Sequence, residues 1–419
     1  MIKHPANQIQ STSGYPGLFS LPVLVGALGF FVDIFDLLLF SIVRKPSLAS
    51  LGLSSEEVLH SGELIISVQM IGLTLGGILW GIMGDKKGRL SVLFGSILLY
   101  SLANLANGMV QTVPQYVLVR FLAGLGLAGE LGASITLVTE MLPAHRRGLA
   151  ATIIASTGVA GALVAYLVYN ATQDWRLCYY IGGGLGILLL LLRARMSESG
   201  LYHEVKSSQV RRGDFWMLFN NRDRFLRYAK GVLIGFPVWF VIGVLITFSD
   251  QFGKEMGIEG IDPAKAIFYQ YIAIGLGDIS AGLLSNYLKS RKKALTVFYV
   301  ILVISITLYF LQSQGWGNQT TMYWICAAMG FGSGISVLYI TMSAEQFGTN
   351  LRATTAISIP NLVRGLLPLI LIFQRLLQQI THSYLKAGMI AAVFVMVASA
   401  WALYTTRETF GKDMDFIES

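Results

Sequence analysis

Residues 77–93 read GILWGIMGDKKGRLSVL, and residues 282–298 read GLLSNYLKSRKKALTVF. In each stretch an apolar run ends in a short basic turn, and a second apolar run follows at once. A membrane-spanning helix needs about 20 predominantly apolar residues at a rise of about 1.5 Å per residue. Each stretch therefore predicts two such helices joined at the membrane surface, and the likeness of the two stretches predicts an internal repeat.

The composition extends this prediction to the whole chain. Hydrophobic residues make up 54% of the 419 positions and charged residues 13%, whereas soluble domains carry about 25% charged residues. So few charges cannot cover a water-facing surface, which indicates that lipid surrounds most of the protein. Breaking the sequence at its polar clusters gives twelve candidate spans, at residues 18–43, 61–84, 89–110, 114–140, 148–172, 175–194, 226–250, 265–288, 293–313, 319–345, 352–380 and 384–406.

A second echo supports two halves, because TEMLPAHRRG at 139–148 is matched by AEQFGTNLRAT at 344–354. The longest hydrophilic stretch lies between the sixth and seventh spans. We therefore expect an all-α integral membrane protein with twelve transmembrane helices in two pseudo-symmetric six-helix bundles. The expected parts are a tail at 1–17, a bundle at 18–194, a central loop at 195–225, a bundle at 226–406 and a tail at 407–419.

The distribution of basic residues predicts which side of the membrane each loop faces. Most of the 31 Lys and Arg residues fall in alternate loops, at Lys86–Arg89, Arg146–Arg147, Arg193–Lys230 and Lys289–Lys293. The other loops hold only Arg44, Lys45, Arg176, Lys254, Lys265 and Lys386. Because loops rich in Lys and Arg stay inside, both termini are expected in the cytoplasm. The net charge of +8 then reflects topology, and nucleic acid is not an expected partner.

Two motifs resemble a known family. Gly81-Ile-Met-Gly-Asp-Lys-Lys-Gly-Arg89 is similar to the loop signature GxxxDRxGRR of the major facilitator superfamily, with Lys86 and Leu90 as departures. RFLAGLGLAGE at 120–130 is similar to its span-four signature RxxxGxGxG. FVDIFDL at 31–37 and AEQFGTNLRAT at 344–354 resemble the metabolite:proton symporter branch.

This resemblance implies a secondary active transporter that works by alternating access. The expected activity is proton-coupled symport of a small carboxylated or zwitterionic metabolite, driven by the proton gradient without a cofactor. The expected partners are a small, anionic substrate, protons and membrane lipid. The expected place is the bacterial cytoplasmic (inner) membrane, and the expected state is a monomer.

Ionisable residues inside the membrane are candidates for the coupling machinery, because each costs about 2.5–3.5 kcal/mol to insert. Asp33 and Asp36 share one face of the first span, and their repulsion favours a proton on one of them near neutral pH. The resemblance implies that Arg120 pairs with Asp36, with Asp33 as the alternative. A permanent structural ion pair stays open. Glu130 belongs either to the proton or substrate path or to helix packing.

Arg364 has no acid within one turn of its own span. Three roles stay open for it: binding a substrate anion, pairing with Asp278, or lining the path. Seven aromatic and amide residues either line a substrate pocket or pack against helices and lipid; they are Phe35, Gln69, Tyr166, Phe236, Trp239, Tyr271 and Tyr339.

Charges at the cytoplasmic helix ends are candidates for an inner gate. Asp85 or Glu140 with Arg89 would latch the first half, and Arg147, Glu345 and Arg352 occupy the matching places after spans four and ten. Ordinary topological charge is the alternative interpretation.

The main alternative function is an exporter or importer of a drug-like compound or a siderophore in the same fold. An enzyme is disfavoured, because the five histidines lie in tails, loops or span ends, and no Cys–His spacing suggests a metal site. Cys178 and Cys326 lie in apolar runs and are expected to be buried thiols. A solute sensor is disfavoured, because no stretch reads as a soluble signalling domain.

Overall fold

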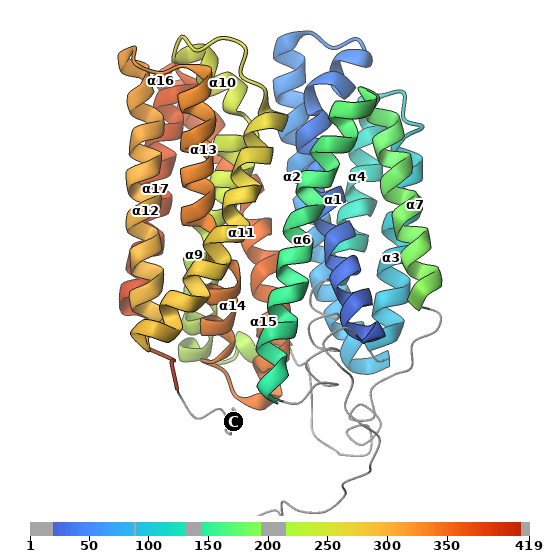
Figure 1. The fold of residues 1–419 in the computed structure, drawn as a ribbon, viewed down its shortest axis with the longest axis vertical. Helices are drawn as coiled ribbons and strands as arrows, with labels where there is room; N and C mark the ends of the chain where they lie inside the picture. Colours follow the sequence, from blue (N-terminus) through green and yellow to red (C-terminus); the bar gives the residue numbers. More distant parts are fainter. Residues whose placement is uncertain (1–19, 88, 131–143, 194–214, 412–419) are drawn as a thin grey trace, which may run out of the picture.

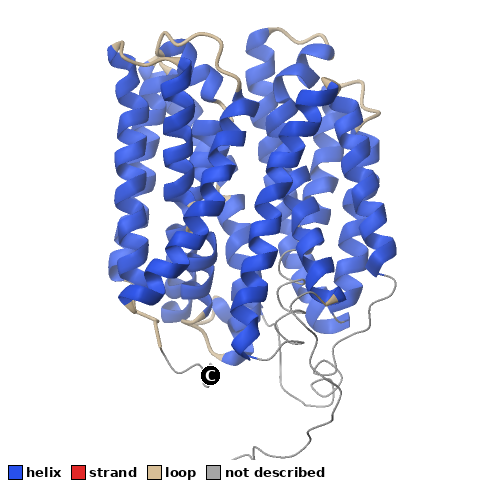
Figure 2. Ribbon diagram, viewed as in Figure 1, coloured by secondary structure: helices blue, strands red, loops and turns tan. Residues whose placement is uncertain are grey.

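The computed structural model describes residues 20–87, 89–130, 144–193 and 215–411, and every regular element in these ranges is a helix (Figure 2). The helices form two bundles that stand side by side along the long axis (Figure 1). The first half contributes α1 (Leu21–Ser50), α2 (Ser55–Lys87), α3 (Arg89–Asn107), α4 (Val113–Leu127), α6 (Ala144–Thr172) and α7 (Trp175–Arg193). The second half contributes η1 (Phe215–Leu218), α9 (Arg222–Phe240), η2 (Val241–Ile246), α10 (Ser249–Glu255), α11 (Pro263–Leu288), α12 (Arg291–Leu311), η3 (Gln312–Gln314), α13 (Gln319–Ser333), α14 (Ser336–Ala344), α15 (Thr349–Gly365), α16 (Leu367–Thr381) and α17 (Tyr384–Thr405).

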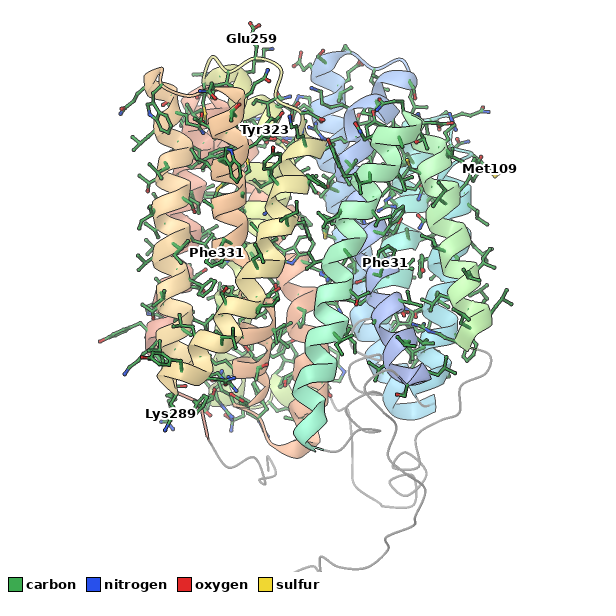
Figure 3. The ribbon with its side chains drawn as sticks, viewed as in Figure 1. Phe31, Met109, Glu259, Lys289, Tyr323 and Phe331 are labelled. Carbon is green, nitrogen blue, oxygen red and sulfur yellow. The ribbon has the colours of Figure 1, made fainter. Side chains whose placement is uncertain are left out.

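These helices are suited to a bilayer. Among the described residues nine helical stretches are long and apolar enough to cross a membrane, and Ser91–Asn107 and Val113–Leu127 are shorter apolar helices. With α6, which has 29 residues, they make up the twelve predicted spans in two bundles. Large apolar side chains such as Leu283 and Ile380 stay exposed, as lipid contact requires. Figure 3 shows the charged Glu259 and Lys289 at opposite ends of the bundles.

The two ends of the bundles are distinguished by their turns. The turns from α1 to α2 and from α16 to α17 lie at one end, which we call the α1–α2 end (Figure 1). The turns from α2 to α3 and from α11 to α12 lie at the other, which we call the α2–α3 end. By the distribution of basic residues, the α2–α3 end is the one expected in the cytoplasm.

Two helices, α1 and α7, include an arginine that the sequence analysis counted as a loop residue. α1 continues through Arg44 and Pro46 to Ser50, beyond the predicted end of the first span at residue 43. Arg193 is the last residue of α7. Both arginine side chains are fully buried, so the interpretation of Arg44 and Arg193 as loop charges is wrong. The physical reason is that each guanidinium finds a carboxylate inside the protein.

The second half breaks three of its spans, where the sequence predicted continuous helices. The tenth span divides into α13 and α14 at Gly334 and Ile335, and the eleventh divides into α15 and α16 at Leu366. The seventh passes from α9 through the π-helical turn η2 before α10. At Gly334 the chain presses on α11, because an added Cβ would lie 2.5 Å from the Cα of Gly277. Breaks of this kind free backbone groups that neighbouring side chains must satisfy.

The two halves meet along α2, which packs on α15 and α16, and along α6, which packs on α11. Asn361 of α15 donates from Nδ2 to the carbonyl oxygen of Ala128 at 3.3 Å. Gly77 of α2 gives Asn361 its place, since an added Cβ would lie 3.0 Å from that same Nδ2. Such close contacts explain why glycine spacing recurs in α2. Cys178 and Cys326 are both buried and free, as expected.

Candidate functional site

A cavity lies between the two halves, in the middle of the molecule. It encloses about 190 Å³ and is bounded by residues of α1, α6, α9, η2, α11, α14 and α15. Five of the predicted substrate residues line it, namely Trp239, Tyr271, Asp278, Tyr339 and Arg364. The sequence did not single out its remaining walls, which include Phe30, Ile34, Ile154, Val159, Ile274, Ser336, Thr341 and Pro360. The lining is thus mostly apolar and aromatic, with a few polar groups.

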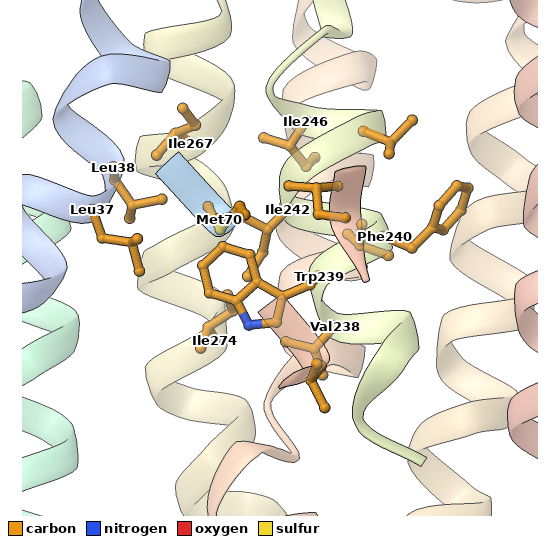
Figure 4. Packing of buried hydrophobic residues seen from close by; sticks show 14 of the residues in the cluster. Leu37, Leu38, Met70, Val238, Trp239, Phe240, Ile242, Ile246, Ile267 and Ile274 are labelled. Atoms are coloured by element: carbon orange, nitrogen blue, oxygen red, sulfur yellow. The ribbon is translucent and has the colours of Figure 1, made fainter. Parts of the chain in front are cut away.

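Arg364 is the cation of this cavity. It lies in the last turn of α15 and is 4% exposed. Its Cζ stands 5.3 Å from the centre of the Trp239 ring, an arrangement that attracts a cation to the ring face. The Trp239 indole belongs to the same buried hydrophobic cluster as Met70, Ile242 and Ile274 (Figure 4).

The acid nearest to Arg364 comes from the other half. Oδ2 of Asp33, in α1, lies 4.0 Å from Nη1 of Arg364, the outer limit of an ion pair. The sequence considered Asp278 as the partner across the cavity, but Asp278 instead accepts a hydrogen bond from the backbone N–H of Ser336 at 2.8 Å. That bond caps the first turn of α14 after the break at Gly334. Asp278 is therefore committed to the broken helix, which corrects the pairing considered for it.

Asp36 and Arg120 form an ion pair inside the first half. Arg120 Nη1 lies 3.2 Å from Asp36 Oδ1, and Arg120 Nη2 donates to the backbone oxygen of Asp36 at 3.2 Å. Asn104 accepts a further bond from Nη1 at 3.5 Å, and the guanidinium stands 5.5 Å from the centre of the Tyr179 ring. Both charged side chains are fully buried. The structure thus brings together the two residues that the resemblance pairs, and the proton-coupling role stays a prediction.

A second buried ion pair lies in the same half. Glu130, just beyond the end of α4, accepts hydrogen bonds from both terminal nitrogens of Arg193, one of them at 3.0 Å. Arg193 also donates to the carbonyl oxygen of Leu93 at 3.1 Å. Gly29 of α1 faces the pair, and a Cβ at that position would collide with both side chains. Glu130 therefore has a fixed partner that the sequence treated as loop charge.

Four predicted pocket residues lie outside the cavity. Tyr166 stacks at a tilt on Phe268, with the ring centres 4.7 Å apart, where α6 meets α11. Phe236 is buried within α9, Gln69 is buried in α2, and Phe35 is buried in α1. These four residues occupy packing positions in this structure.

Of the predicted gating residues, Glu345 has a described side chain. Glu345 pairs with Arg291 at 3.2 Å and accepts a hydrogen bond from Thr409 Oγ1 at 2.6 Å. The side chains of Asp85, Arg89, Arg147 and Arg352 lie outside the described part of the chain, as does Glu140 altogether.

Glu408 completes this cluster at the α2–α3 end. Its carboxylate accepts hydrogen bonds from the Ser290 hydroxyl and from the backbone N–H groups of Arg291 and Lys292, at the start of α12. Partial burial raises the pKa of Glu408, but the bonds from Ser290 and from backbone amides outweigh it and lower the pKa from 4.5 to about 2. Ser290 stands where Asp85 stands in the first-half repeat, so Glu408 supplies the carboxylate that the second-half turn lacks.

Among the described residues, the two shortest ion pairs between the halves lie at the α1–α2 end. Arg44 of α1 pairs with Asp250 of α10 at 2.7 Å and donates to the carbonyl oxygen of Thr247 at 3.2 Å. Glu63 of α2 pairs with Arg375 of α16 at 2.6 Å. The sequence missed both, because residues more than 200 positions apart gave no local signal of contact.

Comparisons with known proteins agree with this architecture. The family model described as Major Facilitator Superfamily matches residues 26–371. The niacin transporter of Acinetobacter baylyi is 28% identical over 69% of this chain and 72% of its own length. The 3-(3-hydroxy-phenyl)propionate transporter of Escherichia coli is 25% identical over 71% and 73%, and the cis,cis-muconate transport protein of A. baylyi is 25% identical over 80% and 82%.

A solved structure shows the same fold. The xylose transporter of E. coli, in a partially occluded inward-open conformation, superposes with a TM-score of 0.71 at 18% identity, over 94% of this chain and 99% of that one. The family match covers most of the chain, and its relatives are transporters rather than enzymes. The chain therefore belongs to the major facilitator superfamily of multi-pass membrane transporters.

Proposed function

We propose that this chain is a proton-coupled symporter for small carboxylates that carry a flat, unsaturated body. The observation that carries the proposal is Arg364, a buried guanidinium against Trp239 in a cavity that is otherwise mostly apolar. A guanidinium binds a carboxylate through two parallel hydrogen bonds, and aromatic walls pack against a flat ring. Relatives that carry niacin, muconate and 3-(3-hydroxy-phenyl)propionate support this substrate class.

The size of the cavity supports a small metabolite over the alternative substrates. Pockets for drug-sized ligands enclose about 300–1,000 Å³, whereas this cavity encloses about 190 Å³. A siderophore or a typical drug needs the larger volume.

The proposed setting is the bacterial inner membrane, with both termini in the cytoplasm and the α1–α2 end outside. The site lies within a single chain, which supports a monomeric carrier. In intact cells, a membrane-impermeant maleimide should label Lys254→Cys at the α1–α2 end. Lys289→Cys, at the other end, should react only after permeabilisation. The reverse pattern would overturn the proposed orientation.

A ligand screen on the purified protein tests the substrate class. Benzoate and nicotinate should raise the melting temperature and bind in calorimetry, whereas the neutral isosteres benzamide and nicotinamide should bind far more weakly. Arg364→Gln should weaken benzoate binding on the order of 100-fold, because one charged partner of a desolvated contact is lost. The matched control is Arg222→Gln, an exposed arginine at the start of α9, which should leave the affinity unchanged. Equal binding of benzoate and benzamide would refute the proposal.

A further inference from the structure

Asp33 differs from the other buried acids of the first half. It is fully buried in the middle of α1, yet neither of its carboxylate oxygens accepts a hydrogen bond within the described part of the chain. Asp36 and Glu130 are each hydrogen-bonded by their own arginine. The counter-charge of Asp33 is Arg364, at 4.0 Å and on the opposite half.

Arg364 lines the cavity and has an N–H donor that makes no hydrogen bond within the described residues. Its Nε makes no hydrogen bond among the described residues, and the side chain both lines the cavity and faces Asp33. A guanidinium carries five N–H donors in a flat fork. It is therefore able to face a carboxylate placed in the cavity, where the donors that Asp33 leaves unused would bind it.

The charges around Asp33 and Arg364 limit how many anionic groups the cavity can hold at once. The ionisable groups that interact with Asp33 are Arg364 from α15, Glu130 beyond α4, Asp36 on its own helix, and the tyrosines Tyr100 from α3 and Tyr271 from α11. Arg120 and Arg193 are occupied by Asp36 and Glu130, and Asp278 adds another acid to the cavity wall. A substrate carboxylate would thus share Arg364 with Asp33, and an uncompensated buried charge costs several kcal/mol.

We propose that Arg364 serves two carboxylates in turn, Asp33 in the empty carrier and the substrate in the loaded one, so that anion binding loads a proton onto Asp33. The inference rests on the proposed function, since it requires that the cavity bind a carboxylate. One proton from solution bonds to an Asp33 oxygen, the contact of Asp33 with Arg364 ends, and the substrate carboxylate takes the guanidinium. The charge of the site is the same before and after, and one proton travels with each carboxylate.

The test measures proton uptake by the purified protein on addition of benzoate, in weakly buffered detergent solution. The wild type should take up about one proton per benzoate at alkaline pH, and its Kd should rise about tenfold per pH unit there. Benzamide, which is neutral, should bind without proton uptake. Asp33→Asn should bind benzoate at least as tightly as the wild type, with no proton uptake and with a Kd independent of pH.

Two variants separate Asp33 from its neighbours. Asp36→Asn and Asp278→Asn should each keep the proton uptake, whereas loss of uptake in either with its retention in Asp33→Asn would overturn the assignment. Wild-type binding of benzoate without proton uptake would refute this inference and leave the proposed function standing. Failure of the wild type to bind benzoate or nicotinate at any pH would refute the proposed function itself. The wild-type measurement decides whether a proton is taken up, and the Asp36→Asn and Asp278→Asn variants decide which residue takes it even if Asp33→Asn does not fold.

Discussion

The two halves of the molecule use their charged and aromatic residues differently. In the first half, Asp36–Arg120 and Glu130–Arg193 are buried pairs that close on themselves with hydrogen bonds. In the second half Arg364 faces the other half, and the ring-bearing residues Trp239, Tyr271 and Tyr339 line the cavity. The second half also breaks three of its spans, at Gly334, at Leu366 and at the turn η2. The two closed ion pairs of the first half therefore form a fixed frame of charges, whereas in our proposal Arg364 of the second half binds the ligand.

The largest expected effect breaks the fixed frame. Glu130→Gln leaves Arg193 buried without a counter-charge, which should cost about 3–5 kcal/mol of stability. We expect a large fall in the melting temperature and in the yield of monodisperse protein on size-exclusion chromatography. The double variant Glu130→Gln with Arg193→Gln should recover part of the loss, because no unpaired charge remains. If the single variant melts like the wild type, the pair does not hold the first half together.

The next effect concerns the charge that faces the ligand. Arg364→Lys keeps the positive charge but removes the flat fork, so that benzoate binding should weaken by about tenfold. Because Arg364 makes only a loose contact with Asp33, the melting temperature of the Arg364→Lys variant should stay close to that of the wild type. Calorimetric titration with benzoate and a thermal melt measure the two quantities. A large loss of stability with unchanged affinity would reverse the contrast between the halves.

An effect of about the same size concerns the contact between the halves at the α1–α2 end. Asp250→Asn breaks the pair with Arg44, whose side chain is buried, and should open this end more often. Labelling of Ser41→Cys, which lies beside Thr247 at this junction, should then speed up on the order of tenfold, equivalent to about 1.4 kcal/mol. Lys45→Gln is the matched control, because Lys45 lies 3.5 Å from Asp250 but is half exposed and contributes little. Equal labelling of all three proteins would show that the pair does not close this end.

The sequence was sufficient for the spans and, through the resemblance, for the Asp36–Arg120 pair, but not for the other contacts between charged residues. Apolar length predicted the helices, because the bilayer imposes it on each span separately. Arg44 and Arg193 were misread because a charge at a helix end looks the same in sequence whether it faces water or a buried carboxylate. Arg364 and Asp33 lie in different halves, so that their approach depends on how the bundles pack. The break at Gly334 was missed for a related reason, since a glycine in an apolar run predicts close packing as well as a break.

The smallest expected effect is at the surface of the second half. Glu408→Gln weakens the cap on α12 and should lower the melting temperature on the order of 2 °C at neutral pH. The pKa of Glu408 is lowered to about 2, so its contribution is complete above about 4.5 and is lost only as the pH falls toward about 2. The difference between variant and wild type should therefore be the same at pH 6 and pH 8. A difference that vanishes between these two values would contradict the lowered pKa.

The same carboxylate has a consequence for how the protein is made. Ser290 leaves the ribosome 118 residues ahead of Glu408, so the turn between α11 and α12 is inserted before its cap exists. Until translation has passed Glu408, the backbone N–H groups of Arg291 and Lys292 must donate to water at the membrane surface. The start of α12 therefore lacks its carboxylate cap until the end of the chain is made. A reporter fused just before Arg407 would leave those amides uncapped for good, whereas one fused beyond Gly411 would keep the cap in place.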